Sequence, residues 1–235
     1  MKNDNLNSRR TFLGSLALGA AAAGSLSLLT GCKDEGETEA TVAATTTPEP
    51  EKLHEADEWF KGVKGKHRIV YDGSTPHDGF AIVWNWAFYL TNNQTGTPDE
   101  DMTAVSVLRH NAIAFALEDR LWEKYKLGEF FSINGNTTKE PLLRNPYYEP
   151  QDGDFILPGI DGIKRLQERG AMFCVCDLAL NVYSGFIAQG MGLEAADIYK
   201  DFVSGVHPGI QIVPSGVWAL GRAQELGCGY IFAGN

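Results

Sequence analysis

Short apolar runs alternate along the chain with longer amphipathic segments, which predicts strands separated by helices. Runs rich in β-branched and aromatic residues, bounded by turn residues, predict five strands. These strands are residues 67–71, 103–108, 171–176, 209–213 and 230–232. Between them, apolar residues recur three and four positions apart, as they do in helices. Because strands that alternate with helices need right-handed crossovers, we expect an α/β fold with a parallel sheet covered on both faces.

The predicted helices differ in how deeply they are buried. Almost every residue of 80–90 is apolar, so this helix lies deep between elements or forms a subunit interface. A second helix is expected to run from Ala114 to Tyr125. Further helices are expected at 160–169, 183–190, 193–203 and 217–226. Residues 129–155 hold turn residues with little periodicity, which predicts an insertion that covers the site.

The N-terminal residues resemble bacterial export signals. Arg9 and Arg10 are followed by Phe, Leu and a modestly apolar segment rich in Ala and Gly, which resembles a twin-arginine signal. That segment ends in Leu-Thr-Gly-Cys, which resembles a lipobox, where the signal is cut before Cys32 and this cysteine is lipidated. The alternatives are an ordinary secretory peptide or membrane anchor, and a cysteine that lies near a cleavage site by chance.

These patterns divide the chain into three parts. We expect a signal peptide over 1–31, a disordered tether rich in Thr, Glu, Ala and Pro over 32–58, and a folded domain over 59–235. Several acyl chains on Cys32 anchor a protein stably without spanning the bilayer. The expected location is therefore the cell envelope, on the non-cytoplasmic side of a bacterial membrane, which is the periplasm where there are two membranes.

The net charge bears on the choice of partner. The formal net charge is −10 with histidine neutral. Residues 1–31 hold three basic residues and one acidic residue, so the remaining chain carries −12. Because such a surface repels phosphate backbones, we do not expect nucleic acid as a partner.

The third predicted strand ends at Cys176, where a helical pattern begins. In open α/β sheets ligands bind outside the carboxyl ends of strands, and a helix N-terminus stabilises a thiolate beside it. His110 ends the second strand and shares this edge with Asp72, Pro214 and Ser215. We expect His110 to take the thiol proton or to stabilise the thiolate. The alternatives are a Cys176 that serves as a small buried apolar residue and a structural His110.

The other cysteines are expected to stay free. Residues i and i+2 of a strand have Cα atoms about 6.5 Å apart, near the limit for a disulfide, so Cys174 should not pair with Cys176. Cys228 precedes the fifth strand and lies toward the opposite end of the sheet. We predict three free thiols, with Cys176 exposed. Because the sequence has no paired histidine spacing, dinucleotide fingerprint or nucleophile-elbow motif, we expect no metal site and no cofactor.

Several of these segments together resemble the DsrE/DsrF-like family. The similarity covers 170–180, 208–217 and 223–231, and the strand that ends in 108–112 also matches. The resemblance implies a three-layer α/β/α domain around a five-stranded, mainly parallel sheet, commonly assembled into homo-oligomers. It also implies that Cys176 carries sulfur as a persulfide and passes it between partner proteins.

Two functions are therefore open. One is the handling of sulfane sulfur, or a related thiol reaction, at Cys176, with His110 tuning its protonation and a sulfur donor or acceptor protein as partner. Such a protein is a sulfur carrier or transferase. The other is a non-catalytic envelope domain that binds a small ligand or a protein partner through the sheet edge and the insertion.

Overall fold

A five-stranded, all-parallel sheet forms the centre of the protein. The structure is a computed structural model, which describes residues 51–235, with side chains from Glu55 onward. The strands are β1 (His67–Gly73), β2 (Met102–Leu108), β3 (Met172–Cys176), β4 (Ile210–Val213) and β5 (Gly229–Phe232). Their order across the sheet is β4-β3-β2-β1-β5, and every neighbouring pair is parallel. The predicted α/β fold is confirmed.

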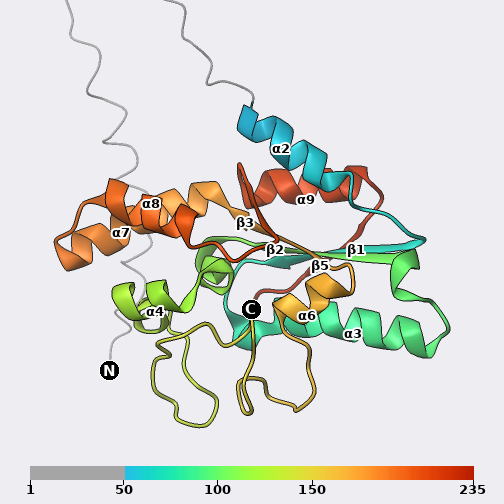
Figure 1. Ribbon diagram of the computed structural model, residues 1–235, viewed down its shortest axis with the longest axis horizontal. Coiled ribbons are helices and arrows are strands. Elements are labelled where there is room, and N and C mark those ends of the chain that lie inside the picture. Colours follow the sequence, from blue (N-terminus) through green and yellow to red (C-terminus); the bar gives the residue numbers. More distant parts are fainter. Residues whose placement is uncertain (1–50) are drawn as a thin grey trace, which may run out of the picture. The chain divides into compact units, whose positions relative to one another are not determined.

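Helices cover both faces of this sheet, so the fold has three layers (Figure 1). The α-helices are α2 (Glu51–Phe60), α3 (Phe80–Gln94), α4 (Asp119–Tyr125), α5 (Leu127–Phe130), α6 (Ile163–Glu168), α7 (Asp177–Met191), α8 (Ala195–Ser204) and α9 (Gly216–Glu225). Three 3-10 helices are η1 (His77–Gly79), η2 (Asp99–Asp101) and η3 (His110–Ala116). Figure 1 shows α2 and α9 over one face and α3 and α6 over the other. Helices α7 and α8 pack against each other.

The strand register brings the carboxyl ends of the strands to one edge of the sheet. Gly73 of β1 is aligned with Leu108 of β2, and Cys176 of β3 with Val213 of β4. The residues that follow these strands therefore lie close together in space, although they are far apart in the sequence. We call this side of the sheet the carboxyl edge, and the side where the strands begin the amino edge.

The central strands are buried on both sides, as parallel strands between two helical layers must be. All seven residues of β2 are buried. Successive residues face different apolar clusters: Ala104 belongs to one and Val105 to the other. Polar contacts between α3 and this strand satisfy the Ser106 hydroxyl. Asn85 Nδ2 donates to Ser106 Oγ (3.0 Å), and Ser106 Oγ donates to the carbonyl of Ala81 (2.9 Å).

Helix α3 buries only one of its faces. Its buried residues are Ala81, Ile82, Asn85 and Tyr89. The side chains of Trp84, Trp86 and Phe88 are half-buried and pack against the edge of the same core. The helix therefore combines a core face with a partly exposed aromatic face, because its apolar residues outnumber the positions that the sheet can cover.

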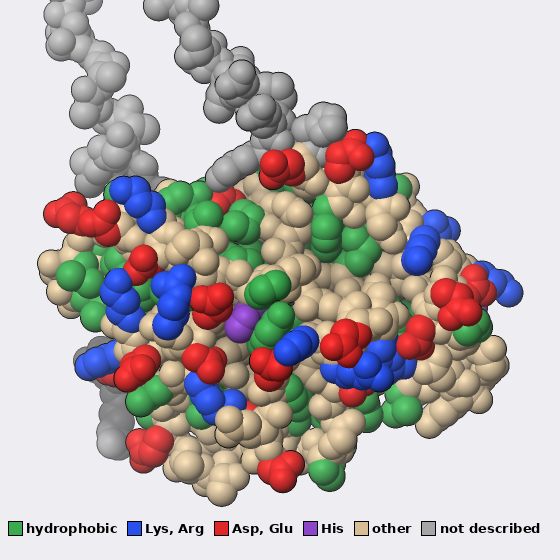
Figure 2. Space-filling model, viewed as in Figure 1, with side chains coloured by type: hydrophobic (Ala, Val, Ile, Leu, Met, Phe, Trp, Pro, Cys, Tyr) green, Lys and Arg blue, Asp and Glu red, His purple; other side chains and the backbone are tan. Residues whose placement is uncertain are grey.

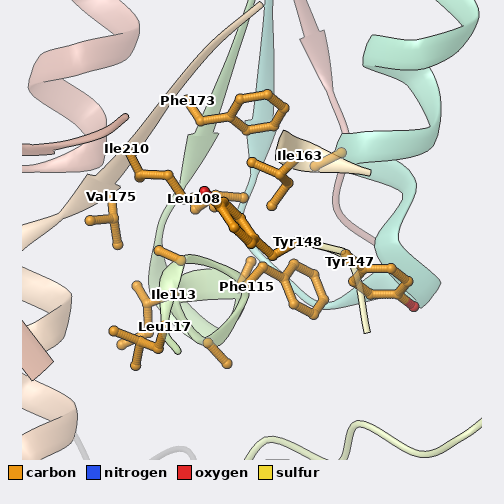
Figure 3. Close-up of a cluster of buried hydrophobic side chains, with 14 of the residues drawn as sticks. Leu108, Ile113, Phe115, Leu117, Tyr147, Tyr148, Ile163, Phe173, Val175 and Ile210 are labelled. Carbon is orange, nitrogen blue, oxygen red and sulfur yellow. The ribbon is translucent and has the colours of Figure 1, made fainter. Parts of the chain in front are cut away.

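Residues 131–162 contain no helix or longer strand, yet part of this segment belongs to the core (Figure 3). Tyr147 and Phe155 are buried, and Tyr147 packs edge-on against Phe115 of η3. Asn145 holds the segment in place, because its Nδ2 donates to the carbonyls of Phe115 (2.8 Å) and Leu117 (3.0 Å). Burial of each aromatic side chain stabilises this arrangement by roughly 2–3 kcal/mol. The predicted insertion is thus irregular in backbone but well packed.

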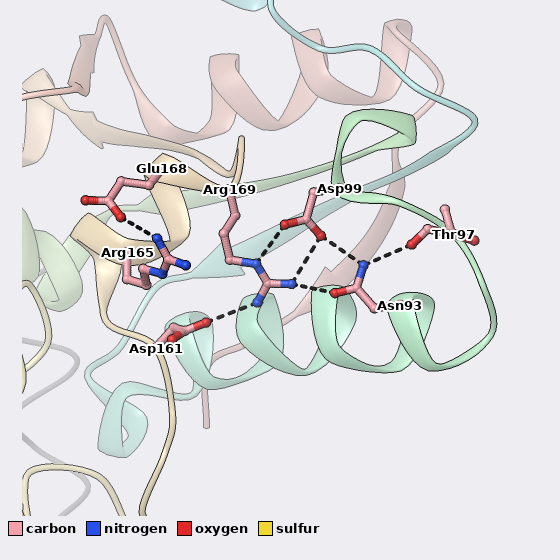
Figure 4. A network of polar contacts seen from close by, with 7 residues as sticks. All are labelled: Asn93, Thr97, Asp99, Asp161, Arg165, Glu168 and Arg169. Atoms are coloured by element: carbon pink, nitrogen blue, oxygen red, sulfur yellow. Dashed lines mark hydrogen bonds and ion pairs between the residues drawn. The ribbon is translucent and has the colours of Figure 1, made fainter.

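A polar network closes the amino edge (Figure 4). Arg169, which precedes β3, donates to Asp99 (2.9 Å), Asp161 (3.0 Å) and Asn93 (2.7 Å). Its guanidinium also lies 4.9 Å from the centre of the Tyr89 ring. The Arg169 bonds hold the pKa of Asp99 below its usual range. This network joins α3, η2 and the end of the insertion.

The predicted helix from Ala114 to Tyr125 was wrong. The chain forms η3, is extended at Leu117, and only then enters α4. Leu117 pairs with Val206 as an isolated bridge. Its carbonyl and that of Ala114 accept hydrogen bonds from Trp122 Nε1 (3.1 and 3.2 Å). Side-chain donors, Trp122 of α4 and Asn145 of the insertion, therefore replace the bonds that a continuous helix would make.

Three further expectations need smaller corrections. Helix α2 begins at Glu51, inside the predicted tether 32–58. Its residues Ala56 and Phe60 lie one helical turn apart, and both are buried in the apolar cluster that α9 also joins. Asp72 belongs to β1, which is longer than predicted, and not to a turn. Helix α7 starts directly after Cys176 and includes the predicted 183–190.

Candidate functional site

Cys176 lies at the carboxyl edge, where β3 gives way to α7, as the sequence predicted. It is the N-cap residue of α7, and its Sγ accepts a hydrogen bond from the backbone N–H of Ala179 (3.3 Å). The sulfur therefore lies against the positive end of a helix of 15 residues. The expectation that Cys176 is exposed was wrong, since only 6% of the residue is accessible. Capping turns the sulfur toward its own helix and into the core.

Arg109 directly follows β2, the strand beside the one that ends in Cys176, and sequence reasoning missed it. Two hydrogen bonds join its guanidinium to Asp72, with Nε–Oδ1 2.6 Å and Nη2–Oδ2 2.9 Å. Tyr230 donates a third bond to Asp72 Oδ2 (2.9 Å). The bond to Asp72 is the main reason that the pKa of Arg109 is raised, so the guanidinium stays charged.

The backbone of α9 limits where Arg109 can go. A Cβ placed on Gly216 would lie 2.5 Å from Arg109 Cβ and 2.6 Å from its Cδ. Only glycine leaves room for the arginine stem to pass the start of α9. A signal for Arg109 was present in the sequence, because a carboxylate buried at a strand end needs a cation from a neighbouring strand end. Asp72 is 2% exposed.

His110 lies at the same edge but is engaged elsewhere. Its Nδ1 is 3.0 Å from the hydroxyl of Tyr183, which donates to Asn111 Oδ1. Within the described part of the chain, no hydrogen bond joins His110 to Cys176. The backbone of His110 has a φ of 50°, in the left-handed region. The structure thus places the predicted pair on one edge without bringing the imidazole into contact with the sulfur.

Pro214 and Ser215 support the edge through their backbone and hydroxyl groups. Ser215 is the N-cap of α9, and its Oγ accepts from the N–H of Trp218 (3.2 Å). The Pro214 carbonyl accepts from the N–H of Leu178 (3.3 Å), which ties the first turn of α7 to the end of β4. Pro214 therefore holds the helix that Cys176 caps, whereas Ser215 holds the start of α9.

A polar pocket opens beside this group of residues. It has a volume of about 310 Å³ and lies among the segments after β1 and β2, the start of the insertion and the last residue of the chain as given. We call it the rim pocket. Its lining residues are Thr75, Pro76, His77, Asp78, Asn111, Phe131, Ser132, Ile133, Asn134, Tyr147 and Asn235. Sequence reasoning placed a site at this edge but did not identify this pocket, because five separate stretches of the chain form it.

Strained backbone gathers around the rim pocket. His77, Asp78 and Ser132 have positive φ values of 37°, 48° and 57°. Left-handed conformations cost non-glycine residues on the order of 1 kcal/mol each and cluster at functional sites. Contacts hold the His77 turn from two sides: its Nδ1 donates to the Ala233 carbonyl (3.1 Å), and a Cβ on Gly79 would meet the Tyr147 ring at 2.6 Å.

The other two cysteines face the interior. Cys174 and Cys228 are free and buried, as is Cys176, so the prediction of three free thiols is confirmed for the described residues. Burial raises the pKa of both thiols above the usual range. Within residues 55–235, no three His, Cys, Asp or Glu side chains come together in a way that could hold a metal ion.

The export residues Arg9, Arg10 and Cys32 lie outside the described residues, so the signal and its lipidation stay predictions. Among the described helices none combines the length and apolarity needed to cross a bilayer. On the face shown in Figure 2, acidic and basic side chains are interspersed.

Comparison with known proteins gives no match to a protein-family model and no significant match to a curated protein. The resemblance to the DsrE/DsrF-like family therefore stays a prediction from the segments named above.

Proposed function

We propose that this protein is an exported, lipid-anchored domain of the DsrE-like kind that carries sulfane sulfur as a persulfide on Cys176. The observation that supports this most directly is the position of the sulfur. It caps the N-terminus of α7, at the edge where Arg109 follows the neighbouring strand β2. Positive backbone dipoles at a helix N-terminus suit an anionic sulfur, the nucleophilic form of cysteine.

The proposed step is a sulfur transfer without net oxidation. The Cys176 thiolate attacks the outer sulfur of a donor persulfide, a new S–S bond forms at Cys176, and the donor leaves as its thiolate. An acceptor thiolate then attacks the outer sulfur, which restores Cys176. Because Cys176 is buried at rest, the first turn of α7 must move for either partner to reach the sulfur. The bonds from Ala179 and Leu178 are the ones that such a movement breaks.

In this proposal Arg109 takes the role that the sequence suggested for His110. Arg109 lies at the end of the strand next to the one that Cys176 ends, and Asp72, which also accepts a bond from Tyr230, holds its guanidinium. His110 positions Tyr183 and, through it, Asn111. The expected consequence is that a His110→Gln variant retains most of its reactivity at Cys176, whereas an Arg109 variant does not.

Peptide-level mass spectrometry tests the carrier function. The folded chain is incubated with a low-molecular-weight persulfide and then alkylated, and each cysteine peptide is read separately. We expect a mass gain of one sulfur on Cys176 that a reductant removes. Cys174 and Cys228 serve as internal controls, because both are buried and lack a cap. An unmodified Cys176, or equal modification of all three residues, would overturn the proposal.

The anchor needs its own test. Metabolic labelling with a fatty acid should label the protein, and a Cys32→Ser variant should lose the label. An Arg9→Lys, Arg10→Lys double variant should remain in the cytoplasm, because the twin-arginine pathway reads the pair itself. Label on the Cys32→Ser variant would contradict lipidation at this residue.

A second candidate function is the binding of a small ligand without chemistry, and the rim pocket favours it. The pocket lies at the carboxyl edge, and residues of this edge and of the insertion line it. Binding through the sheet edge and the insertion is what the non-catalytic alternative predicts. Its volume of about 310 Å³ is at the lower end of the range found for small-molecule sites. A protein that binds a ligand here and in which Cys176 never acquires sulfur would support this candidate over the carrier.

A further inference from the structure

The two outer strands of the sheet, β4 and β5, differ in how well they are covered. Each has one long side without a neighbouring strand. Helix α2 packs against β4, and the Ile212 carbonyl of that strand accepts a hydrogen bond from Gln211 Nε2 (2.9 Å). All four residues of β5 are exposed. Its apolar residues Tyr230, Ile231 and Phe232 are 46%, 40% and 47% exposed, so β5 leaves apolar surface in water.

These exposed side chains lie on both faces of the sheet. The register with β1 aligns Tyr230 with Val70 and Ile231 with Tyr71. Val70 belongs to the apolar cluster that α9 joins, and Tyr71 to the cluster that α3 joins. Because alternate side chains of a strand point to opposite faces, Tyr230 and Phe232 lie on the α9 side and Ile231 on the α3 side. Neither helical layer extends far enough to cover β5.

The backbone of β5 also has groups that face away from the sheet. The N–H of Ala233 donates to the carbonyl of Asp72 in β1 (2.9 Å). Since backbone groups alternate in direction along a strand, those of Ile231 also face β1, and those of Tyr230 and Phe232 face outward. Water hydrates such groups, so they do not require a partner by themselves. They do determine the register in which another strand can be added.

Few of the usual devices protect this strand from pairing. Proteins commonly place a charge, a proline or a bulge on an exposed edge. Residues 226–235 contain no charged residue and no proline. The ladder between β5 and β1 runs over four aligned residues without a bulge. An apolar strand with an uncharged edge is a surface to which another strand can be added.

Charge favours a second copy of the chain as the source of that strand. The chain has a formal net charge of −10, so two copies repel each other wherever acidic surfaces meet. The uncharged stretch 226–235 lets two copies approach without that repulsion. A charged peptide from another protein would find no opposite charge on β5 itself. Asp72, which is aligned with Phe232, is 2% exposed and already bonded to Arg109.

Two antiparallel β5 strands match in one symmetric register. With a two-fold axis at Ile231, Tyr230 of each copy lies opposite Phe232 of the other. These are the residues whose backbone groups face outward, so each of the two pairs can exchange two hydrogen bonds. The aromatic side chains then pack across the strands on one face, and the two Ile231 side chains on the other. Such a contact uses the same surface on both copies and closes as a dimer.

We propose that β5 pairs antiparallel with β5 of a second copy, with the two-fold axis at Ile231. The resemblance to the DsrE/DsrF-like family implies homo-oligomers but leaves their contact surface open. Tyr230 also donates to Asp72, which holds Arg109, so this contact borders the carboxyl edge. The proposal does not depend on sulfur transfer at Cys176.

Sedimentation velocity of the full chain between about 5 and 200 µM tests the dimer, because interfaces below the standard size bind in the micromolar range or more weakly. We expect the average mass to rise toward that of a dimer. Ile231→Lys places like charges opposite each other and should raise the dissociation constant at least about tenfold. Leu157→Lys is the matched control, because Leu157 is an apolar residue of the insertion with 61% exposure. It should associate as the unchanged chain does.

A cysteine at the axis tests the register. In this register Ile231 of the two copies forms a pair without backbone hydrogen bonds, with Cα atoms about 4.5 Å apart, which a disulfide can span. Mild oxidation should therefore link two copies of an Ile231→Cys variant. A Leu157→Cys variant and the unchanged chain should give no such link.

The other outcomes count against the proposal. A chain that stays monomeric up to about 200 µM, a weak affinity, would overturn it. Association that Ile231→Lys leaves unchanged would show that another segment joins the copies. Equal linking of Ile231→Cys and Leu157→Cys would indicate random collision. The Ile231→Lys variant should still acquire sulfur at Cys176, so that failure of the dimer and failure of the carrier function are separate results.

Discussion

Each edge of the sheet holds an arginine bound by carboxylates, but the two arginines differ in what else they touch. At the amino edge, Arg169 has two carboxylates, an amide and an aromatic ring around it. At the carboxyl edge, Arg109 has one carboxylate, which also accepts a bond from Tyr230, and it follows the strand next to the one that ends in Cys176. An arginine whose bonds are all used for packing segments together has a structural role. We propose that Arg109 serves chemistry at Cys176.

The difference follows from the geometry of parallel sheets. Helix N-termini meet the carboxyl ends of strands, so positive backbone dipoles collect there. Strand starts receive helix C-termini, whose negative ends favour cations such as Arg169. The same residue type therefore stabilises an anion at one edge and the chain itself at the other. Four experiments probe this contrast.

The largest expected effect is on stability at the carboxyl edge. Asp72→Asn removes the carboxylate that Arg109 contacts among residues 55–235. It should lower the free energy of unfolding by about 3 kcal/mol, because a partly buried charge loses its partner. Asp99→Asn leaves Arg169 with Asp161 and should cost about 1 kcal/mol. Urea unfolding measures both. Equal losses would mean that the two networks are energetically alike.

Substitution of the two cysteines of β3 sharpens the contrast between edge and interior. Cys174→Ser places a hydroxyl in a fully buried apolar cluster and should cost about 2 kcal/mol. Cys176→Ser should cost less than about 0.5 kcal/mol, because serine also caps a helix. Thermal unfolding of the two variants gives the comparison. A Cys176→Ser loss as large as that of Cys174→Ser would show that the cap does not matter.

A third experiment measures the influence of each arginine on Cys176. Arg109→Met should slow alkylation of Cys176 near neutral pH about tenfold, because the thiolate loses a neighbouring cation. Arg169→Met should leave the rate unchanged, since it lies at the opposite edge. Rates are compared at a denaturant-free condition in which circular dichroism shows both variants folded. A slower rate in Arg169→Met alone would reverse the assignment of roles.

The smallest expected effect is on pH dependence. Bonding to Arg169 lowers the pKa of Asp99, so this carboxylate binds its proton less readily in the folded state than in the unfolded chain. The stabilisation is therefore present above the unfolded value of about 4 and is lost as the pH falls through the lower folded value. The difference in unfolding free energy between the unchanged chain and Arg169→Met should shrink by less than 1 kcal/mol below about pH 4. A difference that grows on acidification would contradict this.

Some of the predictions from local pattern failed for identifiable reasons. Ala114 to Tyr125 has helical spacing throughout, but Asn145 and Trp122 take up the carbonyls that a continuous helix needs. The exposed sulfur expected at Cys176 is buried, because the sulfur caps its own helix. In both cases a hydrogen-bond partner that the spacing of apolar residues does not encode decides the outcome.

Local pattern was sufficient for the five strands and for the position of Cys176 at a strand end. Apolar runs give the five strands, their alternation with helices gives the parallel sheet, and the change of period after Cys176 puts that residue at a strand end and a helix start. These features depend on neighbours within a few positions along the chain. The tertiary structure decided which side chains lie together at that edge of the sheet. Asp72 and Tyr230 lie in two strands, Arg109 follows a third, and the rim pocket is lined by five separate stretches of the chain, so their contacts depend on strand order and register. Strand order and register are properties of the whole sheet, because they depend on pairing between residues that are far apart in the sequence.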